Sequence, residues 1–213
     1  MSVGRALGAA TNFAAKRKTV DQFPTELDMK KPVLAAGAAT AIAAPLGYLL
    51  WKCYPRPGPV GNYSVPEPAK AVDLRRYMGR WYEQYRYDAS FEEGLEAVTA
   101  DYSLNRDGSV RVVNQGRKGG PAGKLRKSVG KAKVADTATN AKLKVSFFGP
   151  FYGNYWVLDH ADDYQWSIVG EPSGRYLWVL TRDAKPGVEM LDELESRVRA
   201  LGYDWSLIHF TQH

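Results

Sequence analysis

His160 is the residue of this sequence whose neighbours most resemble a site for chemistry. Asp159, Asp162 and Asp163 lie beside it, and a mixture of imidazole and carboxylate could hold a metal ion. The same short polar stretch is also typical of a solvated turn between strands, so no metal site is expected. Neither a serine–histidine–aspartate nor a cysteine–histidine arrangement has the context of a catalytic motif, and no catalytic residue is predicted.

Glu83 is the carboxylate best suited to acid–base chemistry if the protein were an enzyme such as an isomerase or esterase. Its alternative role is to pair with an arginine. Residues 116–123 are rich in glycine but lack the Gly-Lys-Ser/Thr that ends a phosphate-binding loop. The sequence contains no cofactor motif, so no cofactor is expected and the protein is predicted not to be an enzyme.

A run of basic residues lies between Asp107 and Asp136, with no acidic residue among them. One interpretation is a solvated loop. The other is attraction to anionic lipid headgroups, which gains about 1 kcal/mol for each cation near such a surface. The cations are Arg117, Lys118, Lys124, Arg126, Lys127, Lys131 and Lys133.

The elements that must position these residues begin with one aromatic strand. Gly79 precedes Trp81, and an alternating strand places Trp81, Glu83, Tyr85 and Tyr87 on one face. So many large rings require an apolar volume to pack against. The strand is therefore expected to border the main core.

Further strands follow at short spacing, most of them joined by polar turns such as residues 105–108. This pattern predicts an all-β, eight-stranded antiparallel up-and-down barrel, because closure removes exposed sheet edges. Apolar residues at helical spacing over 186–201 predict one packed C-terminal helix, and residues 205–210 a final short strand.

The interior of this barrel is expected to be a cavity. Several strands are apolar on both faces, and one helix cannot cover every outer face, so much aromatic area must face inward. The alternative is a barrel plugged by its own side chains, with a purely structural role. The predicted ligand-lining residues, each of which could instead be ordinary core, are Tyr102, Phe147, Tyr155, Trp166 and Trp178.

Charge and cysteine content exclude other classes. The net charge is +6; residues 1–53 carry seven Lys/Arg and three Asp/Glu, hence +4, which leaves +2 for the remainder. So weakly basic a body argues against nucleic-acid binding. Cys53 is the single cysteine, so a domain stapled by intrachain disulfides is excluded.

The N-terminal third predicts attachment to a membrane. Residues 1–32 form a basic, poorly ordered tail, and residues 33–53 contain an uncharged apolar run of bilayer length. This run could be a retained anchor, a cleaved signal, a lipoprotein signal with lipidation at Cys53, or a buried soluble helix. The first three place the body outside the cytoplasm, in the periplasm or cell envelope, and at the outer membrane if Cys53 is lipidated. Residues 54–71 are rich in proline and predict an extended linker.

The folded part, residues 72–213, resembles the bacterial lipocalins, which are similar to apolipoprotein D and to plant temperature-induced lipocalins. Residues 79–83 (Gly-Arg-Trp-Tyr-Glu) resemble the first family signature. Residues 143–155, which include Phe-Phe-Gly-Pro-Phe-Tyr-Gly, resemble the most distinctive stretch of this branch. Residues 176–182 (Tyr-Leu-Trp-Val-Leu-Thr-Arg) resemble the last signature. The long basic extension departs from the short lipoprotein signal of bacterial members.

The resemblance implies a calyx that binds one small apolar or amphiphilic molecule, such as a fatty acid or a lysophospholipid, for storage or transport. It also implies a structural role for Gly79, Trp81 and Arg182. Trp81 and Arg182 would form a cation–π pair that closes one end of the barrel, without contact to the ligand.

Overall fold

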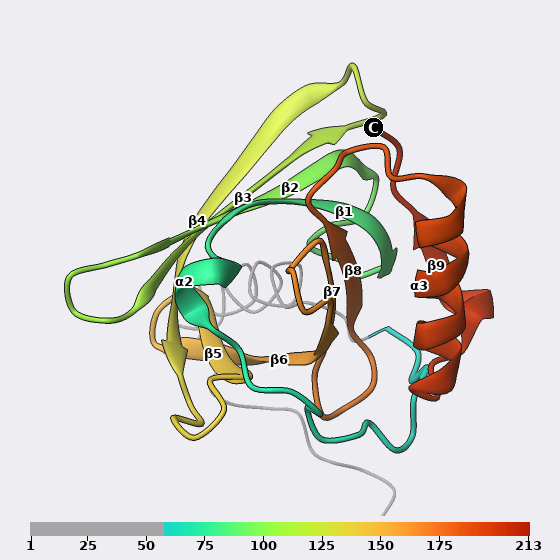
Figure 1. Cartoon of the computed structure of the whole chain (residues 1–213). Helices are drawn as coiled ribbons and strands as arrows, with labels where there is room; N and C mark the ends of the chain where they lie inside the picture. Colours follow the sequence, from blue (N-terminus) through green and yellow to red (C-terminus); the bar gives the residue numbers. More distant parts are fainter. Residues whose placement is uncertain (1–57) are drawn as a thin grey trace, which may run out of the picture. The chain divides into compact units, whose positions relative to one another are not determined.

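The computed structural model describes residues 58–213 (Figure 1). A short helix, α2 (Leu74–Tyr77), precedes the strands, and a longer helix, α3 (Val188–Ala200), and a 3-10 turn, η1 (Trp205–Leu207), follow the eighth. The strands are β1 (Gly79–Tyr87), β2 (Leu95–Leu104), β3 (Val110–Lys118), β4 (Lys124–Val134), β5 (Lys142–Phe148), β6 (Phe151–His160), β7 (Trp166–Gly170), β8 (Leu177–Thr181) and β9 (Ile208–Phe210).

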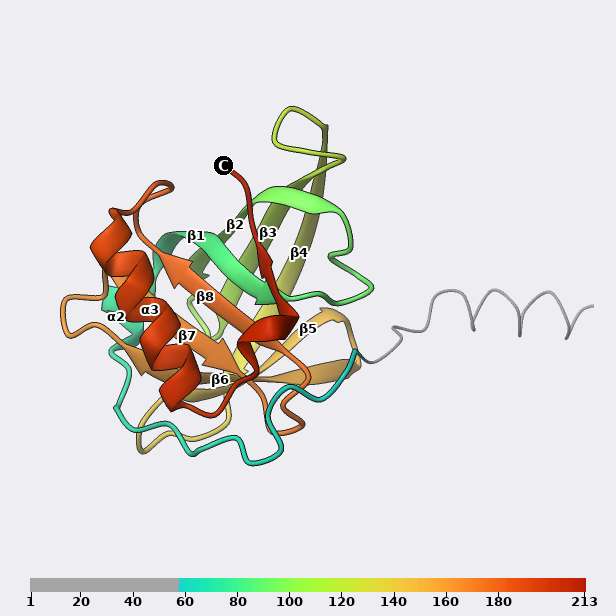
Figure 2. The same ribbon diagram turned by 90° about the vertical axis from the view of Figure 1, so that its right-hand side faces the viewer.

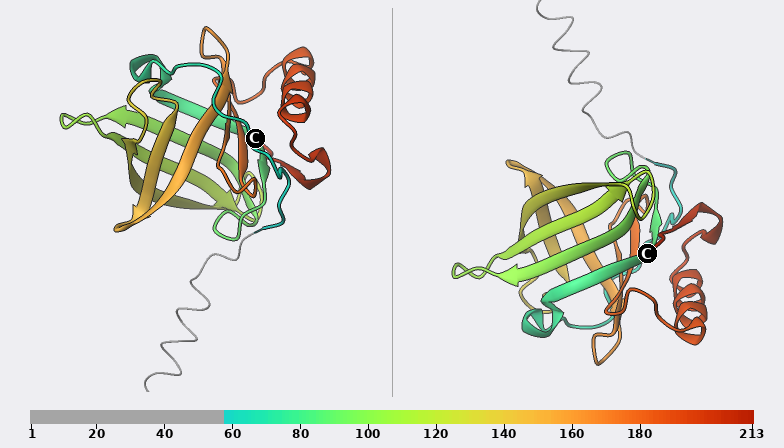
Figure 3. Two further views of the ribbon diagram at one scale, coloured as in Figure 1. Left: turned by 90° about the horizontal axis from the view of Figure 1, so that it is seen from below. Right: turned by 90° about the horizontal axis from the view of Figure 1, so that it is seen from above.

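The first eight strands close into a barrel. Each pairs antiparallel with the next in sequence, and β1 pairs with both β8 and β2 (Figure 3). The second half of β1 leaves β2 and pairs with β9 instead, through Arg86 and His209. The prediction of an eight-stranded up-and-down barrel with one C-terminal helix is confirmed. The predicted N-terminal hydrophobic helix lies outside the described residues.

A bulge in β1 changes which side chains face inward. The register with β8 shifts between Glu83 and Tyr85. Trp81 packs in an interior cluster, whereas Tyr85 and Tyr87 belong to the cluster beneath α3. The prediction that all alternate residues of this strand share one face is therefore wrong beyond Glu83, because the bulge inserts one residue and inverts the alternation.

Helix α3 covers the outer face of β7 and β8 (Figure 2). Its buried residues Leu194 and Val198 are four apart, so they lie on one face of the helix. They share a cluster with Trp166, Ile168 and other apolar residues on the outside of the sheet. Gly202, with φ of +87°, follows the end of the helix in the left-handed conformation that glycine adopts easily.

Arg182 fastens α2 to the barrel. Its guanidinium carbon lies 3.7 Å from the centre of a Trp81 ring. Its Nη1 and Nη2 donate to the carbonyl oxygens of Arg80, Arg76 and Met78 at 2.8, 2.9 and 2.9 Å. Trp81 Nε1 in turn donates to the carbonyl of Tyr77 at 2.9 Å. These bonds satisfy carbonyls at the end of a helix too short to persist alone.

The described part of the predicted linker, residues 58–71, is extended but lies against the barrel. The amides of Gly61 and Asn62 donate to the carbonyl of Gly174, and Asn62 Nδ2 donates to that of Leu201. Asn62 is buried. Hydrogen bonds therefore hold residues 61 and 62 against the barrel. Within residues 58–213, no helix combines the length and apolarity needed to cross a bilayer.

The basic residues lie on a β-hairpin, not in a loop. β3 and β4 pair along their length from Val110–Ala132 to Lys118–Lys124. The second strand begins at Lys124. The hairpin extends beyond the neighbouring strands in Figure 2. Lysine and arginine on such a projecting ribbon also protect its edges from pairing with other chains.

Candidate ligand-binding cavity

The barrel encloses a cavity of about 850 Å³. Small-molecule sites usually measure roughly 300–1,000 Å³, so the space is sufficient for one lipid chain. Leu74, Tyr77 and Met78 line it at one end, where α2 lies across the barrel. Apolar side chains from successive strands form the wall, including Val98, Ala100, Val110, Val112, Ala132, Leu143, Val145 and Leu180.

Four of the five predicted lining residues face this cavity: Tyr102, Phe147, Tyr155 and Trp178. Trp166 does not. It packs beneath α3, with the guanidinium carbon of Arg197 at 4.6 Å from its ring centre. The prediction that Trp166 lines the cavity is wrong, because β7 is buried on both faces and apolarity alone does not reveal which residues point inward.

Tyrosine hydroxyls form a polar chain near the α2 end. The hydroxyl of Tyr155 lies 3.0 Å from that of Tyr77 and 3.1 Å from that of Tyr102, and Tyr77 also contacts Ser167 Oγ at 2.9 Å. Burial raises the pKa of Tyr77 to about 12 and also raises the pKa values of Tyr102 and Tyr155. These phenols stay neutral at physiological pH. Four hydroxyls joined by three hydrogen bonds leave one O–H able to donate elsewhere.

An ion pair is buried where β1 leaves β2. Arg86 Nη1 donates to Glu83 Oε1 at 2.9 Å, and Thr211 Oγ1 donates to the same oxygen at 2.6 Å. Burial raises the pKa of Glu83, an effect that Arg86 and Thr211 oppose. Burial lowers the pKa of Arg86, but Glu83 and the other nearby acids outweigh it, and the net shift is upward. Glu83 thus pairs with an arginine, which is the alternative role that the sequence analysis gave it.

Glu92 is a second buried carboxyl in the cavity wall, 7% exposed. It follows β1 in the loop that leads to β2, and its Oε2 accepts a hydrogen bond from Trp178 Nε1 at 2.9 Å. Burial, followed by the proximity of Glu83, raises the pKa of Glu92 to about 8. Sequence reasoning did not identify this residue, because a glutamate in a polar loop carries no sign of burial.

The end of the cavity away from α2 has an exposed rim. We define the rim as Phe91, Phe148, Phe151 and Tyr152, together with the basic Lys118, Arg126 and Lys127, all of which border the cavity. Phe148 is 82% and Phe151 79% exposed. Large apolar side chains this open to solvent, beside cations, are typical of surfaces that bind a partner or a membrane.

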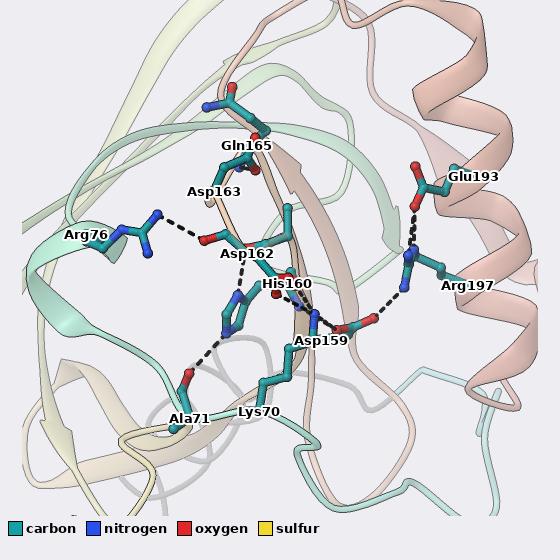
Figure 4. A network of polar contacts seen from close by, with 11 residues as sticks. Lys70, Ala71, Arg76, Asp159, His160, Asp162, Asp163, Gln165, Glu193 and Arg197 are labelled. Carbon is teal, nitrogen blue, oxygen red and sulfur yellow. Dashed lines mark hydrogen bonds and ion pairs between the residues drawn. The ribbon is translucent and has the colours of Figure 1, made fainter.

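His160 is a structural residue in this fold (Figure 4). It is buried, not solvated as the sequence indicates, and stacks on Tyr164 with ring centres 4.6 Å apart. Its ring nitrogens contact the carbonyls of Ala161 and Ala71. The adjacent Asp159 pairs with Lys70 and Arg197. Within residues 58–213, no cluster of three or more metal-binding side chains is present.

This closed, hollow barrel with a packed C-terminal helix defines a small-ligand-binding protein of the calyx type. Residues 72–213 match the model of the lipocalin-like domain, and the chain belongs to the lipocalin family.

Curated relatives agree with this assignment. The chain is 41% identical over 155 residues to the outer membrane lipoprotein Blc of Escherichia coli K12, covering 70% of this chain and 87% of that protein. It is 37% identical over 155 residues to temperature-induced lipocalin-1 of Arabidopsis thaliana, covering 68% and 81%. It is 36% identical over 133 residues to rat apolipoprotein D, covering 58% and 68%.

Among solved structures, the fold is similar to that of insecticyanin from the tobacco hornworm Manduca sexta. The TM-score is 0.57 at 20% identity, over 75% of this chain and 88% of that one. This likeness concerns the fold alone.

Proposed function

We propose that this protein binds one single-chain lipid, a fatty acid or a lysophospholipid, inside the barrel and stores or carries it at the cell envelope. Membership of the lipocalin family supports binding or transport of a small hydrophobic ligand. The observation that carries the finer proposal is the apolar cavity of about 850 Å³. Burying twelve methylenes at roughly 0.8 kcal/mol each supplies about 10 kcal/mol before the costs of binding, enough for micromolar affinity.

Neither alternative role has comparable support. A plugged structural barrel would leave no space for a ligand, whereas this cavity is large. The carboxylate that the sequence offered for acid–base chemistry is Glu83, and it is engaged by Arg86 and Thr211. Family membership also favours a binding protein.

Trp178 should report ligand entry by fluorescence. Of the tryptophans in residues 58–213, it alone lines the cavity, so we expect added oleoyl-lysophosphatidylglycerol to change its emission and to saturate at micromolar concentration. Trp178→Phe should lose most of the signal, while calorimetry still detects binding. Trp166→Phe, which alters a tryptophan on the outer face, is the matched control and should keep the signal. A wild-type titration without saturation would rule the proposal out.

Localisation at the envelope is part of the proposal. The similarity to outer membrane lipoproteins of Escherichia coli and Vibrio cholerae supports it. The predicted anchor and the predicted lipidation at Cys53 lie outside the described residues and remain predictions. Mass spectrometry of the mature N-terminus tests both.

The rim supports docking of the cavity opening on an anionic bilayer. Removing two cations with Arg126→Gln and Lys127→Gln should weaken binding to phosphatidylglycerol-rich vesicles by about 2 kcal/mol, or roughly thirtyfold. Wild-type binding should also weaken with salt. The control is Arg106→Gln with Arg111→Gln, which changes the net charge equally near the opposite end of β3. Sedimentation with vesicles measures the binding of the variants and the effect of salt on wild type. Salt-insensitive binding would contradict this docking mode.

A further inference from the structure

Three carboxyl groups lie around the single guanidinium of Arg86 at the cavity wall, and only two of them pair with it. Glu83 and Arg86 come from β1, and Asp88 and Glu92 from the loop that follows. Both Glu83 and Glu92 are buried and line the cavity. The group therefore holds more negative than positive charge in a region where ionised side chains need partners.

The N–H groups of Arg86 are committed to acceptors other than the Glu92 carboxyl. Nε donates to Asp88 Oδ1 at 3.0 Å, and Nη1 donates to Glu83 and to Thr211 at 2.9 and 3.2 Å. Nη2 contacts Asp88 at 3.0 Å and the backbone carbonyl of Glu92 at 3.5 Å. A guanidinium has five N–H groups, so none remains for the side chain of Glu92.

The other elements around Glu92 supply no cationic partner for its carboxyl. From β8, Trp178 donates one neutral hydrogen bond to Oε2. From β9, His209 contacts Glu96 and Asp88 instead. From β2, Tyr102 is a neutral phenol. Within residues 58–213, the hydrogen bond described for this carboxyl is the one from Trp178 to Oε2. A buried carboxyl in this position is most stable when protonated, and then carries an O–H that can donate.

We propose that Glu92 forms the polar subsite of the cavity, where its protonated carboxyl donates a hydrogen bond to an anionic oxygen of the lipid head. The inference rests on the proposed lipid-binding function and specifies its ligand as acidic. Hydrogen bonds with one ionised partner are roughly twice as strong as neutral ones, so the contact discriminates against uncharged heads. Arg126 and Lys127 at the rim complement the same charge.

The sign of the pH dependence follows from the state of this carboxyl. The raised pKa of about 8 keeps Glu92 neutral in acidic and neutral solution. Above that pH the carboxyl ionises, loses its donor and repels an anionic head. Binding of an acidic lipid should therefore weaken as pH rises through this range, whereas binding of a neutral lipid should not.

The test compares three ligands with the same acyl chain by calorimetry, from about pH 6.5 to about pH 9.5, a range that brackets the raised pKa. Oleate carries a carboxylate, oleoyl-lysophosphatidylglycerol a phosphodiester, and 1-oleoylglycerol no charge. For one or both anions, Kd should rise about tenfold or more across the range. Whichever anion responds identifies the type of head, while the Kd of 1-oleoylglycerol should change less than about threefold.

Two variants separate the subsite from general effects of pH. Glu92→Gln keeps a donor without a titratable proton, so it should bind the anionic ligand at both ends of the range with little pH dependence. Trp178→Phe removes a hydrogen bond that lowers the pKa of Glu92, so it should move the loss of binding to higher pH. If wild type and Glu92→Gln show the same pH profile, the subsite is wrong even though lipid binding stands. If none of the three lipids binds, the proposed function itself fails.

Discussion

Replacing Arg86 with methionine is expected to lower the free energy of unfolding by about 3–5 kcal/mol at neutral pH, because it leaves the buried Glu83 without its cation. Arg86 and Glu83 are almost inaccessible to solvent, with side-chain exposures of 0% and 3%. Methionine retains much of the volume, so the loss would reflect charge rather than a cavity. Urea unfolding followed by circular dichroism measures it.

The same variant should regain stability in acid. Without Arg86, the folded-state pKa of Glu83 lies above its unfolded value of about 4.3, so the destabilisation disappears once pH falls below that value. The double variant Arg86→Met with Glu83→Leu removes both charges and should be much less destabilised than Arg86→Met alone. A single variant as stable as wild type at neutral pH would show that Glu83 needs no cation.

Replacing Arg182 with alanine is expected to cost about 3–4 kcal/mol, from lost charge-assisted hydrogen bonds and the cation–π contact with Trp81. The guanidinium donates hydrogen bonds to the carbonyls of Arg80, Arg76 and Met78, so its loss should free α2 from the barrel. Hydrogen exchange should then rise at Tyr77, whose amide donates a hydrogen bond to the carbonyl of Asp73, the N-cap residue of α2.

Arg182→Lys is the matched variant. Lysine keeps the charge but not the planar fork that reaches several carbonyls at once, so it should recover only part of the stability. Lys185→Ala, at an exposed position nearby in sequence, should change the free energy of unfolding by less than about 0.5 kcal/mol. Equal stability of Arg182→Lys and wild type would reduce the role of Arg182 to charge alone.

The barrel and its closure are predictable from the sequence because they depend on repeated features. Alternating apolar residues, polar turns at short spacing and one C-terminal amphipathic stretch recur over the whole domain. An error in the boundary of one strand would leave the order of strands unchanged.

The inward or outward direction of single side chains is less predictable. The bulge after Glu83 moves Tyr85 and Tyr87 to the outer face, and nothing in the local sequence marks it. Trp166 lies on a strand buried on both sides, where apolarity gives no direction. Both errors arise because alternation shows only which residues of a strand share a face. Which of the two faces points outward is decided by packing against α3.

The polar subsite depends on contacts between distant residues. Glu92 is hydrogen-bonded to Trp178, which lies 86 residues away in the sequence, and Arg86 to Thr211, which lies 125 residues away. Their residue types fit an exposed loop and a C-terminal tail as well as a buried cluster. Only the closed barrel brings them together, so their burial and the raised pKa of Glu92 cannot be inferred from composition or spacing.

Native mass spectrometry of the full chain with oleate tests most directly whether the lipid occupies the barrel interior. Val145→Trp narrows the cavity from a half-buried wall position on β5, whereas Lys144→Trp adds the same ring at the neighbouring exposed position. We predict one bound oleate per chain for wild type and Lys144→Trp, and little or none for Val145→Trp. Equal binding by all three proteins, or uptake that continues without saturation, would place the lipid outside the barrel and contradict the account.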